Sequence, residues 1–231
     1  MKARNAFLVE EYITGQEYSC DFFIEGDTVR IIRIARKWLK PDQAPGIAMA
    51  YQVPGKLPLG IDPEMFRETL RRAAQALGME RALCMLDFLV SSQRLVLLEL
   101  APRPGGDCLP PLIRASCGLD IIGLELDVAE CRPWRVPTPH EWQPLVGLRL
   151  FAPRAGTIAA LDAGPLANDP RVRQVFLTRG PGDRVIHPPE DYQSRILGWA
   201  IFRPFNEATI EQECHDLHNK LVIRYLEKER T

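Results

Sequence analysis

Along the first part of the chain, apolar and polar residues alternate in short runs, which is the pattern of strands that bury one face. The alternation predicts strands at 6–13, 18–24 and 28–36, with Gly15 in the turn that joins the first two. Residues 40–61 contain four prolines and three glycines, so we expect a long irregular loop there. Loops of this kind often carry function.

Apolar residues then recur at helical spacing between positions 62 and 77. Asp62 and Pro63 are typical of the first turn of a helix, and Gly78 is typical of its end. The rest of the chain predicts strands at 83–90 and 94–100, short helices at 109–117 and 120–131, short strands at 145–151, 156–161, 172–178 and 195–202, and a long helix at 207–228.

The order of these elements predicts an α+β fold. The segment 132–145 contains four prolines and little periodicity, which is typical of a connection between domains. We therefore expect a first domain over 1–135 and a smaller α+β domain over 136–231.

Charge and composition exclude several classes of protein. The 231 residues include 29 Lys and Arg and 30 Asp and Glu, so the chain lacks the positive excess of a general nucleic-acid binder. It has no apolar run of the roughly 18 residues that span a bilayer, and its start lacks the apolar core of a signal peptide. Six cysteines without a C-x-x-C pair predict reduced thiols in a cytoplasmic protein, and the ECHDLH segment offers too few ligands for structural zinc.

Two carboxylates stand alone in otherwise apolar strands, Asp87 in 83–90 and Glu99 in 94–100. Because the hairpin is centred near residue 93, they should face each other across it. Facing like charges are destabilising, so a positive group is expected between them. Arg103 in a structural ion pair is one candidate, and Mg²⁺ is the other, since it is typically held by one or two carboxylates and substrate phosphates.

Two neighbouring features allow both a structural and a functional interpretation. Leu89 shares the face of Asp87 and is either an ordinary core leucine or an apolar floor for a flat base. Residues 7–17 carry three glutamates, which form either a solvated acidic edge or a nucleotide contact. In the second case the backbone of Glu10 to Ile13 would meet a base, and Glu17 would bind a ribose.

Three segments together resemble the ATP-grasp superfamily of ATP-dependent ligases: FLVEEYITGQEYSCDFFI, MLDFLVSSQRLVLLELAPRPGGD and GLDIIGLELDVAE. The RPGGD segment is most similar to the corresponding segment of carboxylate–amine ligases related to L-amino-acid ligases and carbamoyl-phosphate synthase. Residues 145–231 resemble the C-terminal domain of those enzymes, with GTI, PGD and RILG segments. The resemblance implies the C-terminal lobe of an ATP-grasp domain, an antiparallel sheet with helices, followed by a small α+β domain.

The resemblance also implies roles for single residues. On the nucleotide side, Glu10 and Ile13 would meet the adenine through their backbones, Glu17 would bind ribose, Leu89 would pack on the base, and Lys37 would reach a phosphate. On the reaction side, Asp87 and Glu99 would hold Mg²⁺, Arg103 would stabilise the phosphorylated intermediate and the oxyanion, and Gly105 and Gly106 would let backbone approach the substrate.

Two departures from the superfamily pattern bear on function. Many relatives carry Asn, a further metal ligand, where this chain has Ala101. The preceding α/β domain and the small lobe with its Gly-rich loop and phosphate-binding lysines are also missing from 1–231.

The resulting expectation is an ATP- and Mg-dependent ligase that joins a small carboxylate to an amine through an acyl phosphate. We expect it to work as a homodimer or with a chain that supplies the missing lobes, and to be inactive alone. The strands at 6–36 should present the contact surface, because an apolar face or unpaired edge is expected there. The alternative is an incomplete remnant that serves as a nucleotide-binding or protein-interaction module.

Overall fold

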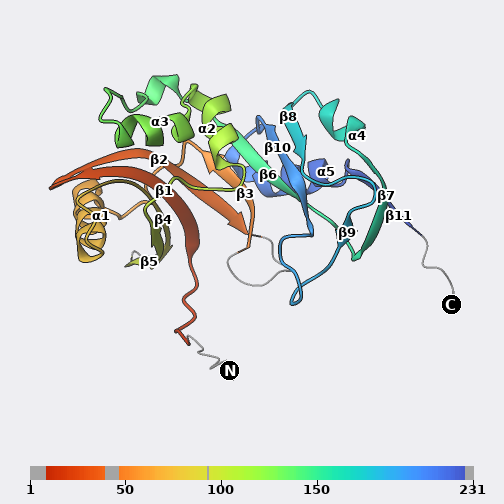
Figure 1. The fold of residues 1–231 in the computed structure, drawn as a ribbon, viewed down its shortest axis with the longest axis horizontal. Coiled ribbons are helices and arrows are strands. Elements are labelled where there is room, and N and C mark those ends of the chain that lie inside the picture. Colours follow the sequence, from red (N-terminus) through yellow and green to blue (C-terminus); the bar gives the residue numbers. More distant parts are fainter. Residues whose placement is uncertain (1–8, 40–46, 93, 227–231) are drawn as a thin grey trace.

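The computed structural model describes residues 9–39, 47–92 and 94–226, and these form an α+β structure around one long antiparallel sheet (Figure 1). The large sheet has eight strands in the order β5-β4-β1-β2-β3-β6-β10-β8. Its strands are β1 (Gln16–Glu25), β2 (Thr28–Leu39), β3 (Ala48–Val53), β4 (Arg81–Ser91), β5 (Arg94–Ala101), β6 (Leu145–Phe151), β8 (Val172–Leu177) and β10 (Ile196–Phe202). A second sheet pairs β7 (Gly156–Asp162) with β9 (Arg184–Val185) and β11 (Val222–Tyr225).

Helices cover both faces of the first half of the sheet. Figure 1 shows α1 (Pro63–Ala76) on one side of β1, β2 and β4, and α2 (Leu109–Cys117) and α3 (Ile121–Ala129) on the other. The alternation along β1 explains this: Phe22 packs with Phe66 of α1, whereas Phe23 packs with Ile113 of α2. The remaining helical turns are α4 (Gly164–Ala167), α5 (Ile210–His218) and the 3₁₀ turns η1 (Pro139–Glu141) and η2 (Glu207–Thr209).

Several predicted elements are confirmed, and their local signals explain them. The Asp62 side chain accepts a hydrogen bond from the Met65 N–H at the start of α1, as expected of an N-cap. Asp120 caps α3 in the same way, and Gly118 has the left-handed φ of 77° that ends α2.

Three predicted elements were wrong. Residues 9–14 form no regular structure, so the strand predicted at 6–13 is not formed over its described part, while 6–8 lie outside the described residues. The expected loop at 40–61 contains β3, whose six residues are all buried, so it lacks the alternation that marks a half-exposed strand. The expected helix at 207–228 ends at His218, and β11 follows because its residues pair with distant β7.

The large sheet runs through both predicted domains. The boundary predicted at 135/136 lies between α3 and η1, and the sheet continues past it where β3 pairs with β6. β1 and β2 lie inside the sheet, so the unpaired edge expected at 6–36 is not found in its described part; the edge strands are β5 and β8. Within the described chain, no helix is long and apolar enough to cross a membrane.

Candidate functional site

Asp87 of β4 and Glu99 of β5 are direct partners across the hairpin, as the sequence predicted. Both line a cavity of 240 Å³, which we call the carboxylate site. Its other lining residues are Ser19, Tyr51, Met85, Arg103, Gly105, Gly106, Asp107 and Leu109. Five of these come from the segment between β5 and the first turn of α2, so this connection forms much of the wall.

The positive partner of Asp87 is Lys37 of β2, whose ammonium contacts the carboxylate directly. Lys37 is 6% exposed, and its Nζ also lies 3.7 Å from Oε2 of Glu17. The sequence signal gave no hint of this pairing, because it depends on the registers of β1 with β2 and of β1 with β4. A buried cation thus offsets part of the repulsion between the two facing acids.

Arg103 is held differently. Its Nη2 lies 3.8 Å from Oε1 of Glu99, and both side chains are more than half exposed. Its Nη1 donates to the carbonyl of Pro104. Arg103 therefore does not lock the two acids into a structural ion pair, and its guanidinium has donors that remain open to the cavity.

The two carboxylates fit a Mg²⁺ ion that also takes phosphate oxygens. Asp87 and Glu99 share one face of the hairpin and border a cavity, which leaves room for non-protein ligands. Over the described ranges, no group of three or more Asp, Glu, His or Cys side chains could hold a metal by itself. Two carboxylates are a number of protein ligands that Mg²⁺ commonly takes, with water or phosphate oxygens as its other ligands.

A fully buried ion pair supports the connection between β5 and α2. Nε of Arg33 lies 2.6 Å from Oδ2 of Asp21, and Arg33 also donates to the carbonyl of Ser19 at 2.9 Å. The other oxygen of Asp21 accepts the N–H of Gly105 at 2.9 Å. A Cβ at Gly105 would come within 2.3 Å of the Arg33 guanidinium, so this position requires glycine. At Gly106 a Cβ would meet only Arg103, at 3.9 Å.

Sequence analysis missed Asp107 and Tyr51. Asp107 has a positive φ of 54°, and its carboxylate accepts the Tyr51 hydroxyl at 3.0 Å. Nη2 of Arg149 lies 3.5 Å from its other oxygen. Burial raises the pKa of Tyr51 far above its usual value, and the charge of Asp107 adds to the shift, so Tyr51 remains a donor. Tyr51 was overlooked because it lies in the strand β3 that the sequence pattern concealed.

The residues expected around a nucleotide are spread along this face. Leu89 is buried and directly faces Glu17 across β4 and β1, on the same side as Asp87. Glu10 is exposed and Ile13 is half-buried, both in the irregular segment before β1. The structure thus brings Glu17, Leu89 and the carboxylate site together, while Glu10 and Ile13 lie before the sheet.

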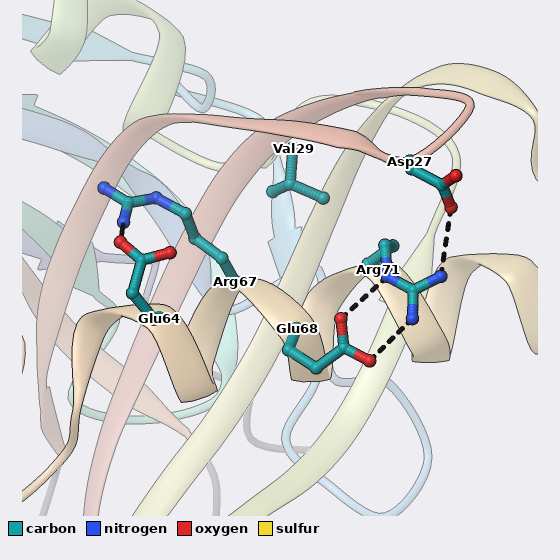
Figure 2. A pocket seen from close by; sticks show the side chains of 6 residues that line it. All are labelled: Asp27, Val29, Glu64, Arg67, Glu68 and Arg71. Atoms are coloured by element: carbon teal, nitrogen blue, oxygen red, sulfur yellow. Dashed lines mark hydrogen bonds and ion pairs between the residues drawn. The ribbon is translucent and has the colours of Figure 1, made fainter.

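A larger cavity of 660 Å³ lies outside this site, between α1 and the β1–β2 turn; we call it the outer cavity (Figure 2). Its charged side chains pair with one another. Arg71 reaches Glu68 at 2.6 Å and Asp27 at 3.1 Å, and Arg67 contacts Glu64. We assign it no chemical role, because its charges are mutually satisfied.

Comparison with known proteins shows what the chain is similar to. Residues 1–111 match the sequence model described as the ATP-grasp domain. This part of the chain is ATP-grasp sequence. It includes Lys37, both facing carboxylates and the connection from Arg103 to Asp107. Among curated proteins, none matches the chain.

Solved ATP-grasp enzymes share the fold over almost the whole chain. L-amino acid ligase from Bacillus licheniformis has a TM-score of 0.73 at 17% identity, over 94% of this chain and 53% of that protein. Phosphoribosylglycinamide synthetase from Anaerococcus prevotii has a TM-score of 0.72 at 16% identity, over 94% of this chain and 55% of that protein. Biotin carboxylase from Campylobacter jejuni has a TM-score of 0.61 at 18% identity, over 93% of this chain and 48% of that protein. The chain thus spans about half the length of these proteins, and the likeness in fold extends into β6 to β11.

Proposed function

We propose that this chain is the part of an ATP-dependent carboxylate–amine ligase that binds Mg²⁺ and stabilises the acyl phosphate. The observation that carries the proposal is the in-register pair of Asp87 and Glu99, facing a cavity beside buried Lys37 and exposed Arg103. Support comes from the solved relatives: a related carboxylase domain was crystallised with MgADP, and L-amino acid ligase shares the fold.

The reaction would take place in two steps. A carboxylate oxygen attacks the γ-phosphorus of ATP, so a C–O–P linkage forms and ADP leaves. A neutral amine then attacks the acyl carbon, a C–N bond forms, and phosphate leaves with the electron pair of the broken C–O bond. When bound, Mg²⁺ neutralises phosphate charge during the first step.

The residues of the chain would hold and neutralise the reacting groups. Asp87 and Glu99 bind the metal, and Lys37 fixes the orientation of Asp87 through their ion pair. Arg103 is loosely paired and exposed, so its guanidinium can turn toward the phosphate and the oxyanion.

The nucleotide would lie along the face shared by Leu89 and Glu17. Leu89 would pack against the adenine, Glu17 would accept from the ribose hydroxyls, and the backbones of Glu10 and Ile13 would meet the edge of the base. Lys37 would contribute charge near a phosphate while paired with Glu17 and Asp87. Gly106, where a side chain would project into open space, would let the substrate approach the backbone.

We further propose that a second polypeptide, either another copy or a complementary subunit, closes the site. Glu99 and Arg103 are more than half exposed, so this chain alone leaves the reaction side open to water. The competing function is a nucleotide-binding or interaction module without turnover. Ala101, directly opposite Met85, favours this module, because many enzymes of the superfamily have a further metal ligand at this position and alanine cannot bind a metal.

Nucleotide binding by calorimetry tests the proposal. Wild-type chain should bind ATP more tightly with Mg²⁺ than with EDTA, and Asp87→Asn and Glu99→Gln should each weaken Mg-dependent binding about tenfold or more. Glu64→Gln in the outer cavity is the matched control and should bind as wild type. Equal binding in all variants, with or without Mg²⁺, would refute the metal assignment.

Phosphate release from ATP with amino-acid mixtures measures turnover. The isolated chain should stay at background, and robust release would refute the need for a second polypeptide.

A further inference from the structure

The outer edge of β8 takes no part in the proposed reaction. β8 and β5 are the two edge strands of the large sheet, and Figure 1 shows them at its opposite ends. Edge strands present unpaired backbone N–H and C=O groups, which favour pairing with another chain unless the edge is protected. β5 is interrupted by a bulge at Leu98, because Glu99 and Leu97 face successive residues of β4. Residues 174–177 of β8 pair with β10 in uninterrupted register and include no charged residue and no proline.

The hydrogen bonds between β8 and β10 show which backbone groups face outward. The N–H of Thr178 donates to a carbonyl of the strand segment next to it, at Leu197, over 2.8 Å. Because alternate residues of a strand direct their backbone groups to the same neighbour, Phe176 and Gln174 also pair with β10. Val175 then directs its N–H and C=O to the outer edge, as does every second residue beside it. Within the described ranges, no strand pairs with this edge.

Phe176 projects from the same edge, on the face of the sheet that carries α2. Its ring stacks on Trp199 of β10, with centroids 5.3 Å apart and an interplanar angle of 26°. The side chain is nevertheless 51% exposed, so about half of its surface is available to another molecule. Aromatic side chains are enriched among the residues that anchor protein interfaces.

A groove of 510 Å³ lies beside Phe176, between β8 and the helices α2 and α3; we call it the edge groove. Arg114 and Asp120 at its margin pair with each other, so they leave no net charge there. The rest of the lining is mostly apolar and comes from Gln174 of β8, from Pro110, Pro111 and Ala115 of α2, and from Ile122 of α3.

Antiparallel pairing of β8 with the same strand of a second copy brings Phe176 and the edge groove together. A twofold axis at Val175, perpendicular to the sheet, joins the outward groups of Val175 to those of the partner's Val175. Phe176 then lies directly opposite the partner's Gln174, in a pair whose Cα atoms are about 4.5 Å apart. Because Gln174 lines the edge groove, each Phe176 would enter the groove of the other copy.

Charge favours this register over the neighbouring one. An axis at Phe176 would place Arg173 directly opposite the partner's Arg179, and facing like charges are destabilising. With the axis at Val175, Arg173 lies opposite the partner's Leu177, and no like charges face each other across 173–177. The edge is therefore complementary to itself in backbone groups, in shape and in charge.

We propose that two copies of this chain dimerise through β8, paired antiparallel about Val175, with Phe176 of each copy in the edge groove of the other. The two large sheets then continue as one, and the two carboxylate sites lie at its far ends, beside β5. This dimer does not cover the carboxylate site, so the polypeptide proposed to close that site binds elsewhere. The dimer is independent of the proposed ligase reaction.

Light scattering at micromolar concentration tests the dimer. Wild-type chain should show twice the monomer mass of 26.1 kDa. Val175→Pro removes an outward N–H that makes no bond to β10, and it should raise the dimer dissociation constant about tenfold or more.

Phe176→Ser, which removes only a half-exposed ring, should weaken the dimer by a similar factor and makes the test independent of the proline variant. Phe205→Ser is the matched control, because Phe205 is 76% exposed and lies outside β8 and the edge groove; it should dimerise as wild type. A monomeric wild type, or a dimer that neither Val175→Pro nor Phe176→Ser weakens, would overturn the proposal.

Disulfide formation tests the register, in a Cys131→Ser background that removes the exposed native thiol. Gln174→Cys and Phe176→Cys proteins should each fail to cross-link alone and should cross-link when mixed, because residue 174 faces residue 176 of the other copy. Cross-linking of either protein with itself would overturn the register. Mg-dependent ATP binding should be unchanged in Phe176→Ser, so failure of the dimer and failure of the ligase proposal are distinguishable.

Discussion

The carboxylate site and the outer cavity are both rich in charge, yet they hold it in opposite ways. In the outer cavity, Arg71 and Arg67 pair with acids three residues earlier on the same helix, through partly or largely exposed side chains (Figure 2). At the carboxylate site, Asp87 is paired with a buried lysine from another strand, and a fully buried pair supports the connection behind it. Cavity volume therefore does not indicate which of the two is the functional site. The carboxylate site differs from the outer cavity because its charged side chains are held by buried partners from other strands.

Energies follow the same division. Exposed pairs at helical spacing contribute about 0.3–0.5 kcal/mol and are weakened by salt. Removal of one partner from a buried pair costs roughly 3–5 kcal/mol, because the other charge is left in a medium of low polarity. Substitutions in the two regions should therefore differ by far more than their similar chemistry indicates.

The largest effect is expected for Asp21→Asn. The substitution leaves the Arg33 guanidinium buried without its carboxylate, so the free energy of unfolding should fall by roughly 3–5 kcal/mol. Urea denaturation at neutral pH measures the loss. The double variant Asp21→Asn with Arg33→Met removes the stranded charge and should recover part of it; no recovery would contradict the ion-pair explanation.

Gly105→Ala should have the next largest effect. Its Cβ would approach the Arg33 guanidinium to 2.3 Å and displace the connection that forms the wall of the carboxylate site. We expect a loss of about 1–3 kcal/mol in unfolding free energy and weaker Mg-dependent ATP binding. Gly106→Ala is the control one residue away and should change stability little, because only Arg103 lies within 4 Å of the added atom.

Lys37→Met should produce a smaller loss that Mg²⁺ reverses. Without the ammonium, Asp87 and Glu17 lose their cation, and we expect about 1–2 kcal/mol of destabilisation in EDTA. Because the metal proposed at Asp87 and Glu99 would replace the lost charge, added Mg²⁺ should raise the melting temperature of the variant more than that of wild type. An equal Mg²⁺ effect in both proteins would argue against a metal at these carboxylates.

The smallest effect is expected in the outer cavity, for Glu68→Gln. The hydrogen bond from Arg71 lowers the pKa of Glu68, so any stabilisation is present above the unfolded pKa and is lost as pH falls through the folded value. The group is exposed, so we expect no measurable change in melting temperature at physiological salt. A clear loss at neutral pH would remove the contrast between the two regions.

Local patterns in the sequence determined the β4–β5 hairpin and the helices α1, α2 and α3. The alternation of residues and the position of the turn predicted that Asp87 faces Glu99. The residue types of Asp62 and Asp120 predicted that they cap helices. These features depend on neighbours a few residues apart, so the sequence states them directly. The ATP-grasp resemblance also came from contiguous segments, 7–24 and 85–107.

Tertiary structure decided everything that depends on pairing between distant strands. Lys37 meets Asp87 only because β2 and β4 flank β1 in fixed registers. Asp107 has its two side-chain partners only because β3 and β6 bring Tyr51 and Arg149 to it. β3 and β11 escaped prediction for the same reason, since burial on both faces or pairing with a remote edge leaves no local period. The sequence determines which side chains are charged. Strand order and register determine which of these charges lie next to each other.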